Sequence, residues 1–208
     1  MSPHQVTWQC ASVLLGYPDE RLLGDLPTVR AAAGSLPAGM GEPLLRVADH
    51  LGAAPLEQRQ AEYVETFDQR RRCNLFLTYF AHGDTRKRGL ALLRFQQVYR
   101  EAGLERDGSE LPDHLCVVLE FATIDPERGR ALLLDHRAGL EVLRLALADE
   151  GSGWAGALEA VCATLPPLRG DEWDAVRRLA AEGPPAEEVG LTPYGAVDLP
   201  MPAVRGAR

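Results

Sequence analysis

The chain has 208 residues, of which 46% are hydrophobic and 25% are charged, and its formal net charge is −8. This composition is typical of one folded domain and excludes a chain that is disordered throughout. The acidic balance argues against a nucleic-acid binder, and no apolar run approaches the ~18 residues of a transmembrane helix. No Lys or Arg precedes Arg21, so a secretory signal is not indicated. We expect a water-soluble, cytoplasmic protein without stable membrane insertion.

The first third of the chain carries turn signals that separate short helices. Gly16-Tyr17-Pro18 is a turn signal, and Asp19 is a helix-capping residue. Pro27 is expected to break the second helix or to lie near its boundary, whereas Pro55 suits a first helical turn. The expected helices are Val6–Leu15, a second one from Asp19 through Arg30–Leu36, Pro43–Ala53 and Pro55–Phe67.

Helical periodicity is clearest in the middle of the chain. The spacing of Leu92, Phe95, Tyr99 and Ala102 predicts a helix after Asp84, and Gly103 is placed to end it. Pro112 is expected to open a further helix with Leu115, Val118, Leu119 and Ala122 on one face. A long helix is expected to start at Asp125-Pro126, with an apolar stripe formed by Leu133, His136, Leu140, Leu143 and Leu147. The last two expected helices are Trp154–Leu165 and Asp171–Ala181.

Strand signals, which are alternating apolar and polar runs bounded by turns, are nearly absent. The sequence therefore predicts an all-α fold, a single-domain bundle of short antiparallel helices over residues 1–182. Residues 183–208 hold five prolines and few large apolar groups. We expect this Pro-rich tail to be extended or disordered.

Cofactor and metal signatures are missing. The four cysteines, at 10, 73, 116 and 162, form no CxxC motif, and the five histidines form no HxxxH or HExxH pair. The sequence has no phosphate-binding loop of the GxxxxGK[ST] type and no GxSxG elbow. We therefore expect no metal, no tightly bound cofactor and no catalytic residue.

Charge is unevenly distributed in the middle of the chain. Residues 70–94 hold six arginines and one lysine against Asp84 alone, and residues 105–127 hold seven acids against Arg106 alone, a net −6. Each run is equally compatible with an ordinary solvated face. The acidic run is also a suitable counter-surface for a basic peptide.

One set of side chains suggests acid–base chemistry. Asp113 and His114 are adjacent, with Glu110 before them and Glu120 two turns later. Neighbours on a helix point about 100° apart and make a poor catalytic pair. Asp113 in a first helical turn is also favoured by the helix dipole alone. A small all-α enzyme or nucleotide-binding protein using Asp113, His114 and Glu120 stays open as an alternative, as does a general helical adaptor.

Several motifs together resemble a known family. The segment Glu110-Leu-Pro-Asp-His-Leu115, continuing through Val117–Phe121, resembles the signature of the TorD-like redox-enzyme maturation chaperones. Further segments are similar to the nitrate reductase molybdenum-cofactor assembly chaperones of the NarJ type; they are Ala11–Pro18, Tyr63–Asp68, Asn74–Leu77 and His82–Gly89. Leu111 stands where many relatives carry proline, which suits the nitrate reductase subgroup, and Cys116 has no expected role.

The resemblance implies a TorD-like all-α fold and a dedicated chaperone that is not an enzyme. Such a protein would bind the N-terminal peptide of the nitrate reductase catalytic (alpha) subunit while molybdenum cofactor is inserted, before membrane docking. Molybdenum cofactor delivery proteins are further candidate partners. The candidate peptide-binding residues are Tyr63, Phe67, Asp68, Leu75, Phe76, Glu110, Pro112, Asp113, His114 and Glu120.

An apolar groove between helices is a common way to bind an amphipathic segment. Phe80, Leu115 and Leu119 are further candidates for its walls. Core packing is the better explanation for Leu115, Leu119 and the two aromatic residues Tyr63 and Phe67. Exposure is expected instead at Phe76, Tyr79 and Phe80, which follow a predicted loop after Asn74.

Overall fold

The computed structural model describes residues 1–83, 85–105, 108 and 110–185. These residues form helices, and their one extended pairing is an antiparallel bridge between Phe76 and His114. The elements are α1 Pro3–Leu14, α2 Glu20–Gly34, α3 Ala38–Gly52, α4 Leu56–Tyr63, a π-helical turn Val64–Asp68, a 3₁₀ turn Arg71–Cys73, α5 Leu77–His82, α6 Arg86–Glu101, α7 Leu115–Ile124, α8 Pro126–Asp135, α9 Arg137–Asp149, α10 Ala155–Ala163 and α11 Gly170–Glu182. The predicted all-α fold is confirmed.

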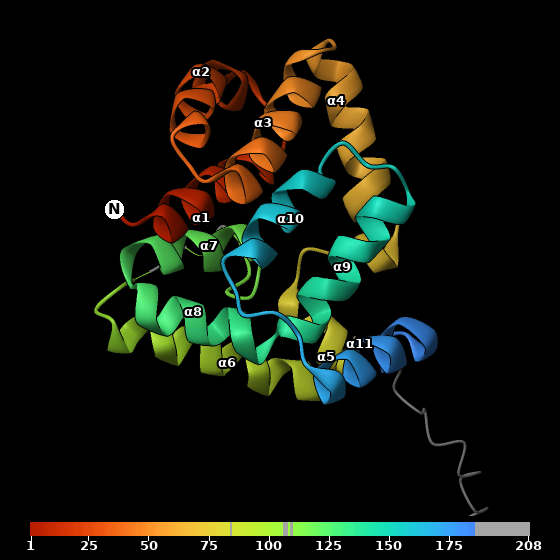
Figure 1. Ribbon diagram of the computed structural model, residues 1–208. Helices are drawn as coiled ribbons and strands as arrows, with labels where there is room; N and C mark the ends of the chain where they lie inside the picture. Colours follow the sequence, from red (N-terminus) through yellow and green to blue (C-terminus); the bar gives the residue numbers. More distant parts are fainter. Residues whose placement is uncertain (84, 106–107, 109, 186–208) are drawn as a thin grey trace, which may run out of the picture.

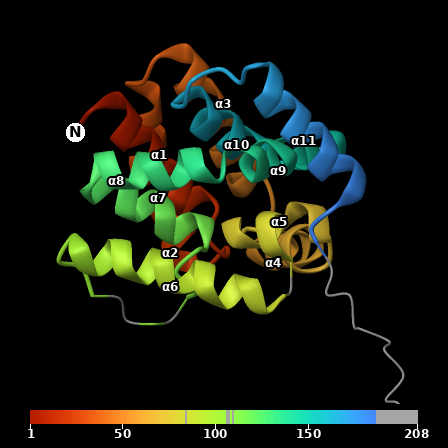
Figure 2. The same ribbon diagram turned by 90° about the horizontal axis from the view of Figure 1, so that it is seen from below.

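The helices pack around one continuous core. α1 packs along α7, and α3 lies between α2 and α10 (Figure 1). α6 runs along one edge of the molecule in both ribbon views (Figures 1 and 2). Trp8 and Trp154 are among the largest fully buried side chains, and the Trp8 indole donates a hydrogen bond to Thr164 Oγ1 at 2.9 Å. The core therefore ties the first helix to α10.

Local capping signals placed several helix ends correctly. The Asp19 carboxylate accepts a hydrogen bond from the Leu22 amide at 2.7 Å, and Asp125 accepts one from the Arg128 amide at 3.1 Å. Gly103 follows α6 with φ +74°, a conformation that glycine adopts without steric cost. Because these interactions lie within a few residues, the sequence alone specifies them.

The prediction of one long helix from Asp125-Pro126 through Leu147 was wrong. The chain breaks between α8 and α9 at His136, where φ is −109° and ψ is 20°. The His136 ring nitrogen Nδ1 lies 2.9 Å from the carbonyl oxygen of Leu132, the acceptor that a continuing helix would offer to the His136 amide. The imidazole therefore replaces a backbone hydrogen bond and permits the turn.

Two prolines lie inside helices, contrary to prediction. Pro27 does not break α2, and its side chain is exposed, so water can solvate the nearby carbonyl group that loses its donor. The third helix begins at Ala38, so Pro43 is an interior residue rather than the first one. The predicted break and start are therefore both corrected.

A short helix, α5, holds two of the residues whose side chains were expected to be exposed after the loop at Asn74. Tyr79 and Phe80 are only 5% and 2% exposed, so the predicted exposure of these two residues was wrong. The physical reason is packing against α9, where the Phe80 side chain fills the space that a Cβ on Gly139 would occupy.

α11 ends at Glu182, followed by Gly183 with φ +74°. The tail predicted from residue 183 falls mainly on 186–208, which lie outside the described residues, as does Asp84 at the expected start of α6. Among the described helices, none combines the length and the apolar character that crossing a membrane requires.

Candidate functional site

A groove of about 890 Å³ opens between the α1–α2 turn, α4, α7 and the end of α6. Its lining brings together eight of the ten residues predicted from the sequence, namely Tyr63, Phe67, Asp68, Leu75, Phe76, Glu110, His114 and Glu120. The other two, Pro112 and Asp113, are buried and do not line it. Phe80, Leu115 and Leu119 are core residues outside the groove, as core packing predicted for the two leucines.

Aromatic rings form one wall of the groove. Tyr63 packs against Phe67 with ring centroids 4.7 Å apart, and the exposed Tyr17 meets Tyr63 edge-on at 5.4 Å. The Tyr63 hydroxyl donates a hydrogen bond to the Leu15 carbonyl at 3.0 Å, which fixes its ring. Burial raises the pKa of Tyr63 far above its usual value, so this phenol stays neutral. The wall is therefore rigid and apolar.

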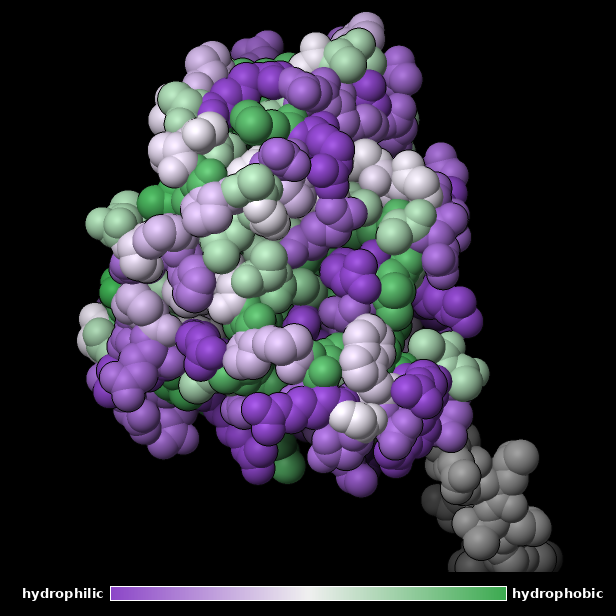
Figure 3. Space-filling model, viewed as in Figure 1, coloured by the Kyte–Doolittle hydropathy of each residue, from purple (hydrophilic) through white to green (hydrophobic). Residues whose placement is uncertain are grey.

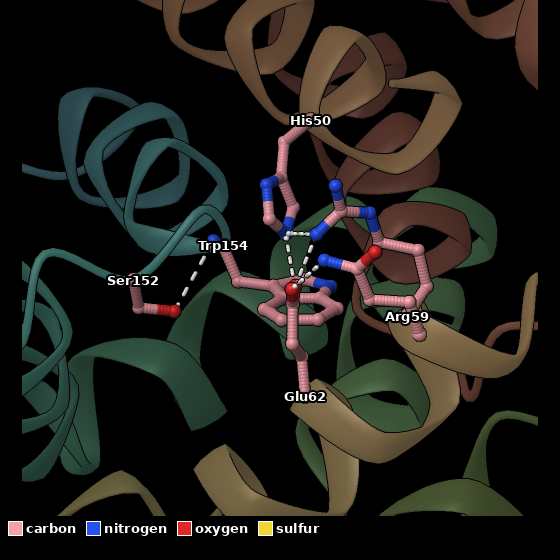
Figure 4. A network of polar contacts seen from close by, with 6 residues as sticks. His50, Arg59, Glu62, Ser152 and Trp154 are labelled. Atoms are coloured by element: carbon pink, nitrogen blue, oxygen red, sulfur yellow. Dashed lines mark hydrogen bonds and ion pairs between the residues drawn. The ribbon is translucent and has the colours of Figure 1, made fainter. Parts of the chain in front are cut away.

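A polar cluster adjoins this wall through Trp154, and Figure 4 shows its residues. Trp154 packs its indole edge-on against Tyr63, with ring centroids 5.7 Å apart, and against the His50 ring at 4.9 Å. Arg59 is only 6% exposed; it lies 3.2 Å from His50 Nε2 and forms an ion pair with Glu62. The cluster thereby links α3 and α4 to the start of α10, behind the aromatic residues.

Asp113 holds the floor of the groove rather than forming its surface. Its side chain is fully buried, and Oδ2 accepts hydrogen bonds from the Thr78 hydroxyl and from the Thr78 amide, the latter at 3.1 Å. Arg88 Nη2 lies 3.8 Å from the same oxygen. The backbone carbonyl of Asp113 accepts a hydrogen bond from the Leu77 amide at 3.0 Å. Asp113 therefore fastens the chain before α7 to the start of α5.

The expectation that Pro112 opens a helix with Asp113 in its first turn was wrong, because α7 begins at Leu115. Pro112 instead offers its carbonyl to the Tyr99 hydroxyl at 2.6 Å. The helix dipole thus does not explain Asp113. Its carboxylate is required by tertiary contacts with Thr78 and Arg88, which no local pattern encodes.

His114 lies next to this anchor, with its ring on the groove side. The ring packs edge-on against Phe76 with centroids 5.1 Å apart, and Arg88 Cζ lies over the same phenyl ring, 5.2 Å from its centroid. Burial lowers the pKa of His114, although Glu110 and Asp113 act in the opposite direction. A neutral imidazole beside a phenyl ring adds to the apolar floor.

Four carboxylates complete the lining, and all four side chains are exposed: Asp68, Glu105, Glu110 and Glu120. No Lys or Arg occurs among the described residues that line the groove. The groove therefore combines aromatic walls with an acidic rim. This combination suits a segment that carries both apolar and basic side chains.

Sequence reasoning missed several lining residues, including Tyr17, Tyr99, Cys116, Phe121 and Ile124. One signal was available in α7, where Cys116, Glu120 and Ile124 recur every fourth residue and so share a face. Burial raises the pKa of Cys116 well above its usual range, so its thiol is a neutral part of the wall. Tyr17 and Tyr99 come from distant segments, and only the fold brings them here.

The structure does not bring Asp113 and His114 together as a hydrogen-bonded acid–base pair. The hydrogen bonds of the Asp113 carboxylate go to Thr78 rather than to the imidazole of His114. Among the described residues, no group of three or more His, Cys, Asp or Glu side chains is arranged to hold a metal ion.

Comparison with known proteins agrees with this description. A family profile described as "Nitrate reductase delta subunit" matches residues 33–160, which include most of the groove. The chain belongs to this family. The predicted relationship to the NarJ-type chaperones is thus confirmed.

Individual relatives of this family member differ in length. The chain is 46% identical over 165 residues to "Nitrate reductase-like protein NarX" of Mycobacterium tuberculosis, covering 76% of this chain but only 24% of that protein. It is 31% identical over 163 residues to the Bacillus subtilis protein named "Probable nitrate reductase molybdenum cofactor assembly chaperone NarJ", covering 77% of this chain and 89% of the relative. The chain thus spans about a quarter of the first relative and most of the second.

A solved structure shares the fold. It is described as "A Putative Redox Enzyme Maturation Protein From Archaeoglobus Fulgidus" and has a TM-score of 0.59 and 28% sequence identity, covering 77% of this chain and 92% of that one. The expected TorD-like bundle is confirmed. The Bacillus subtilis relative and this solved structure are named as an assembly chaperone and a maturation protein, which agrees with a protein that is not an enzyme.

Proposed function

We propose that this protein is a cytoplasmic assembly chaperone for nitrate reductase and that its groove binds the N-terminal peptide of the catalytic (alpha) subunit. In this proposal the peptide is held while molybdenum cofactor is inserted and before the enzyme docks at the membrane. The observation that carries it is that aromatic walls and four carboxylates meet in one groove whose described lining residues include no Lys or Arg. The choice of nitrate reductase as the client rests on the names of the relatives.

Apolar contacts should provide most of the affinity. The Tyr17 and Ile124 side chains are 51% and 65% exposed at the groove, so a bound segment would remove their apolar surface from water. The carboxylates are exposed, and exposed ion pairs contribute at most about 1 kcal/mol each. Salt should therefore weaken binding in part rather than abolish it.

Titration calorimetry with a synthetic peptide from the catalytic subunit's N-terminus tests this proposal at low and high salt. Tyr17→Ser should weaken binding through lost apolar contact, and Glu120→Gln should weaken it mainly at low salt. Glu57→Gln, which removes an exposed carboxylate on α4 away from the lining, is the matched control and should bind as the wild type does.

Each outcome bears on the proposal. No binding of the peptide, or equal binding by the Tyr17 variant, would remove the groove from the mechanism. Complete indifference to salt would remove the acidic rim, and complete loss in salt would show that charge dominates. Normal maturation of nitrate reductase in cells with both Asp113 and His114 replaced would overturn the assignment of the site.

A further inference from the structure

The outer face of α6 carries an exposed apolar pair among cations. Leu90 and Leu93 are 67% and 55% exposed, although both are large hydrophobic residues. They belong to a stripe with 4-3-4-3 spacing whose other members are Arg86, Gln97 and Arg100. Residues at this spacing lie along one face of a helix, so the stripe is continuous.

Further charged residues flank this stripe. Lys87, Arg94 and Glu101 recur every seventh residue on its side, and all eight residues are exposed. We call these eight residues the α6 outer face. It holds four cations and one carboxylate, a net +3, on a chain whose formal net charge is −8. None of the eight lines the acidic groove, so the molecule presents two separate surfaces of opposite charge.

The shape of this face favours a flat partner. α6 has 16 residues and lies along the edge of the molecule, so about 24 Å of one helix side is offered to the surroundings (Figures 1 and 2). In Figure 3, hydrophobic atoms protrude at the lower edge, below hydrophilic ones that lie over α6. Leu90 and Leu93 are both more than half exposed, so they offer apolar surface to a flat partner.

We propose that the α6 outer face attaches this protein reversibly to the surface of an anionic lipid bilayer. Leu90 and Leu93 would enter the headgroup region, and the four cations around them would extend their charged ends to lipid phosphates. Salt screens the remaining acidic surface beyond about 8 Å, so the residues in contact decide the attraction. This attachment requires no membrane-spanning helix, and it is independent of peptide binding in the groove.

Vesicle flotation with the full-length chain tests the proposal. Vesicles of phosphatidylcholine alone are compared with vesicles of equal parts phosphatidylcholine and phosphatidylglycerol. The chain should float with the anionic vesicles and much less with the neutral ones, and added salt should weaken the association. Lys87→Gln with Arg94→Gln should reduce the partition coefficient by about 25-fold, since each cation near an anionic surface contributes about fivefold. Leu90→Ser with Leu93→Ser should also reduce it.

Matched variants separate this face from general charge and apolar effects. Arg177→Gln with Arg178→Gln removes two exposed cations of α11, and Ile124→Ser removes an exposed apolar side chain of the groove. Both should float like the wild type. Urea unfolding of each variant confirms that it is folded.

Three results would overturn the proposal: flotation independent of lipid charge, equal loss in the α11 control, or no loss in the α6 variants. Binding of poly-glutamate through α6 without binding to anionic vesicles would also overturn it, because the partner would then be an acidic protein. The peptide titration above is unaffected by any of these results.

Discussion

Replacing Asp113 should destabilise the protein and the groove together. The buried carboxylate accepts two hydrogen bonds from Thr78 and faces the Arg88 guanidinium, whose side chain is only 17% exposed. Removing one partner of a buried charged pair costs about 3–5 kcal/mol, so we expect this loss for Asp113→Ala. Asp113→Asn keeps one oxygen for the Thr78 amide and loses the charge, so we expect it to lower the free energy of unfolding by about 1.5–3 kcal/mol. Domains of ordinary stability unfold at a cost of about 5–15 kcal/mol, so both losses are measurable.

Urea unfolding followed by circular dichroism measures these losses, and titration of the client peptide measures the groove. Thr78→Val removes only the hydroxyl, and its double-mutant cycle with Asp113→Asn should give a coupling of about 0.5–3 kcal/mol. His114→Gln is the contrast, because its ring lines the groove and binding should fall more than stability. Wild-type stability in Asp113→Ala, or binding lost with stability intact, would refute the anchoring role.

Two further predictions concern the packing and the pH dependence. Gly129→Ala should lower the free energy of unfolding by about 1–3 kcal/mol, because the added Cβ would lie 2.2 Å from Ala122 Cα where α8 crosses α7. Gly24→Ala should stabilise the protein slightly, because open space surrounds this helical glycine. Thermal unfolding that ranks the two variants in the opposite order would contradict this description of the packing. Burial, and to a smaller extent the charge of Arg59, lowers the pKa of His50 below 6.5, whereas Glu62 acts in the opposite direction. The unfolded chain therefore binds more protons near pH 6 than the folded protein does, and stability should fall as the pH drops through 6.5. His50→Gln should reduce that fall in urea unfolding at pH 7 and pH 5, and an unchanged difference would contradict it.

The sequence by itself determined the features that depend on neighbouring residues. Asp19 and Asp125 cap their helices through amides three residues away, and Gly103 ends α6, because these interactions are complete within one turn. Helical periodicity without strand signals determined the all-α class. The order of motifs from Tyr63 to Phe121 determined the family, and eight of the ten candidate residues lie in the groove that the fold forms.

The tertiary structure alone decided what the candidate residues do. Asp113 and His114 are neighbours in sequence, yet one is a buried anchor for Thr78 and the other faces the groove, a division that depends on how α5 packs before α7. The break at His136 and the continuity of α2 through Pro27 likewise depend on which carbonyl groups find another donor or water. Tyr17 and Tyr99 join the groove from segments 82 residues apart. Contacts between distant segments arise only when the chain is folded, so no local pattern could specify them.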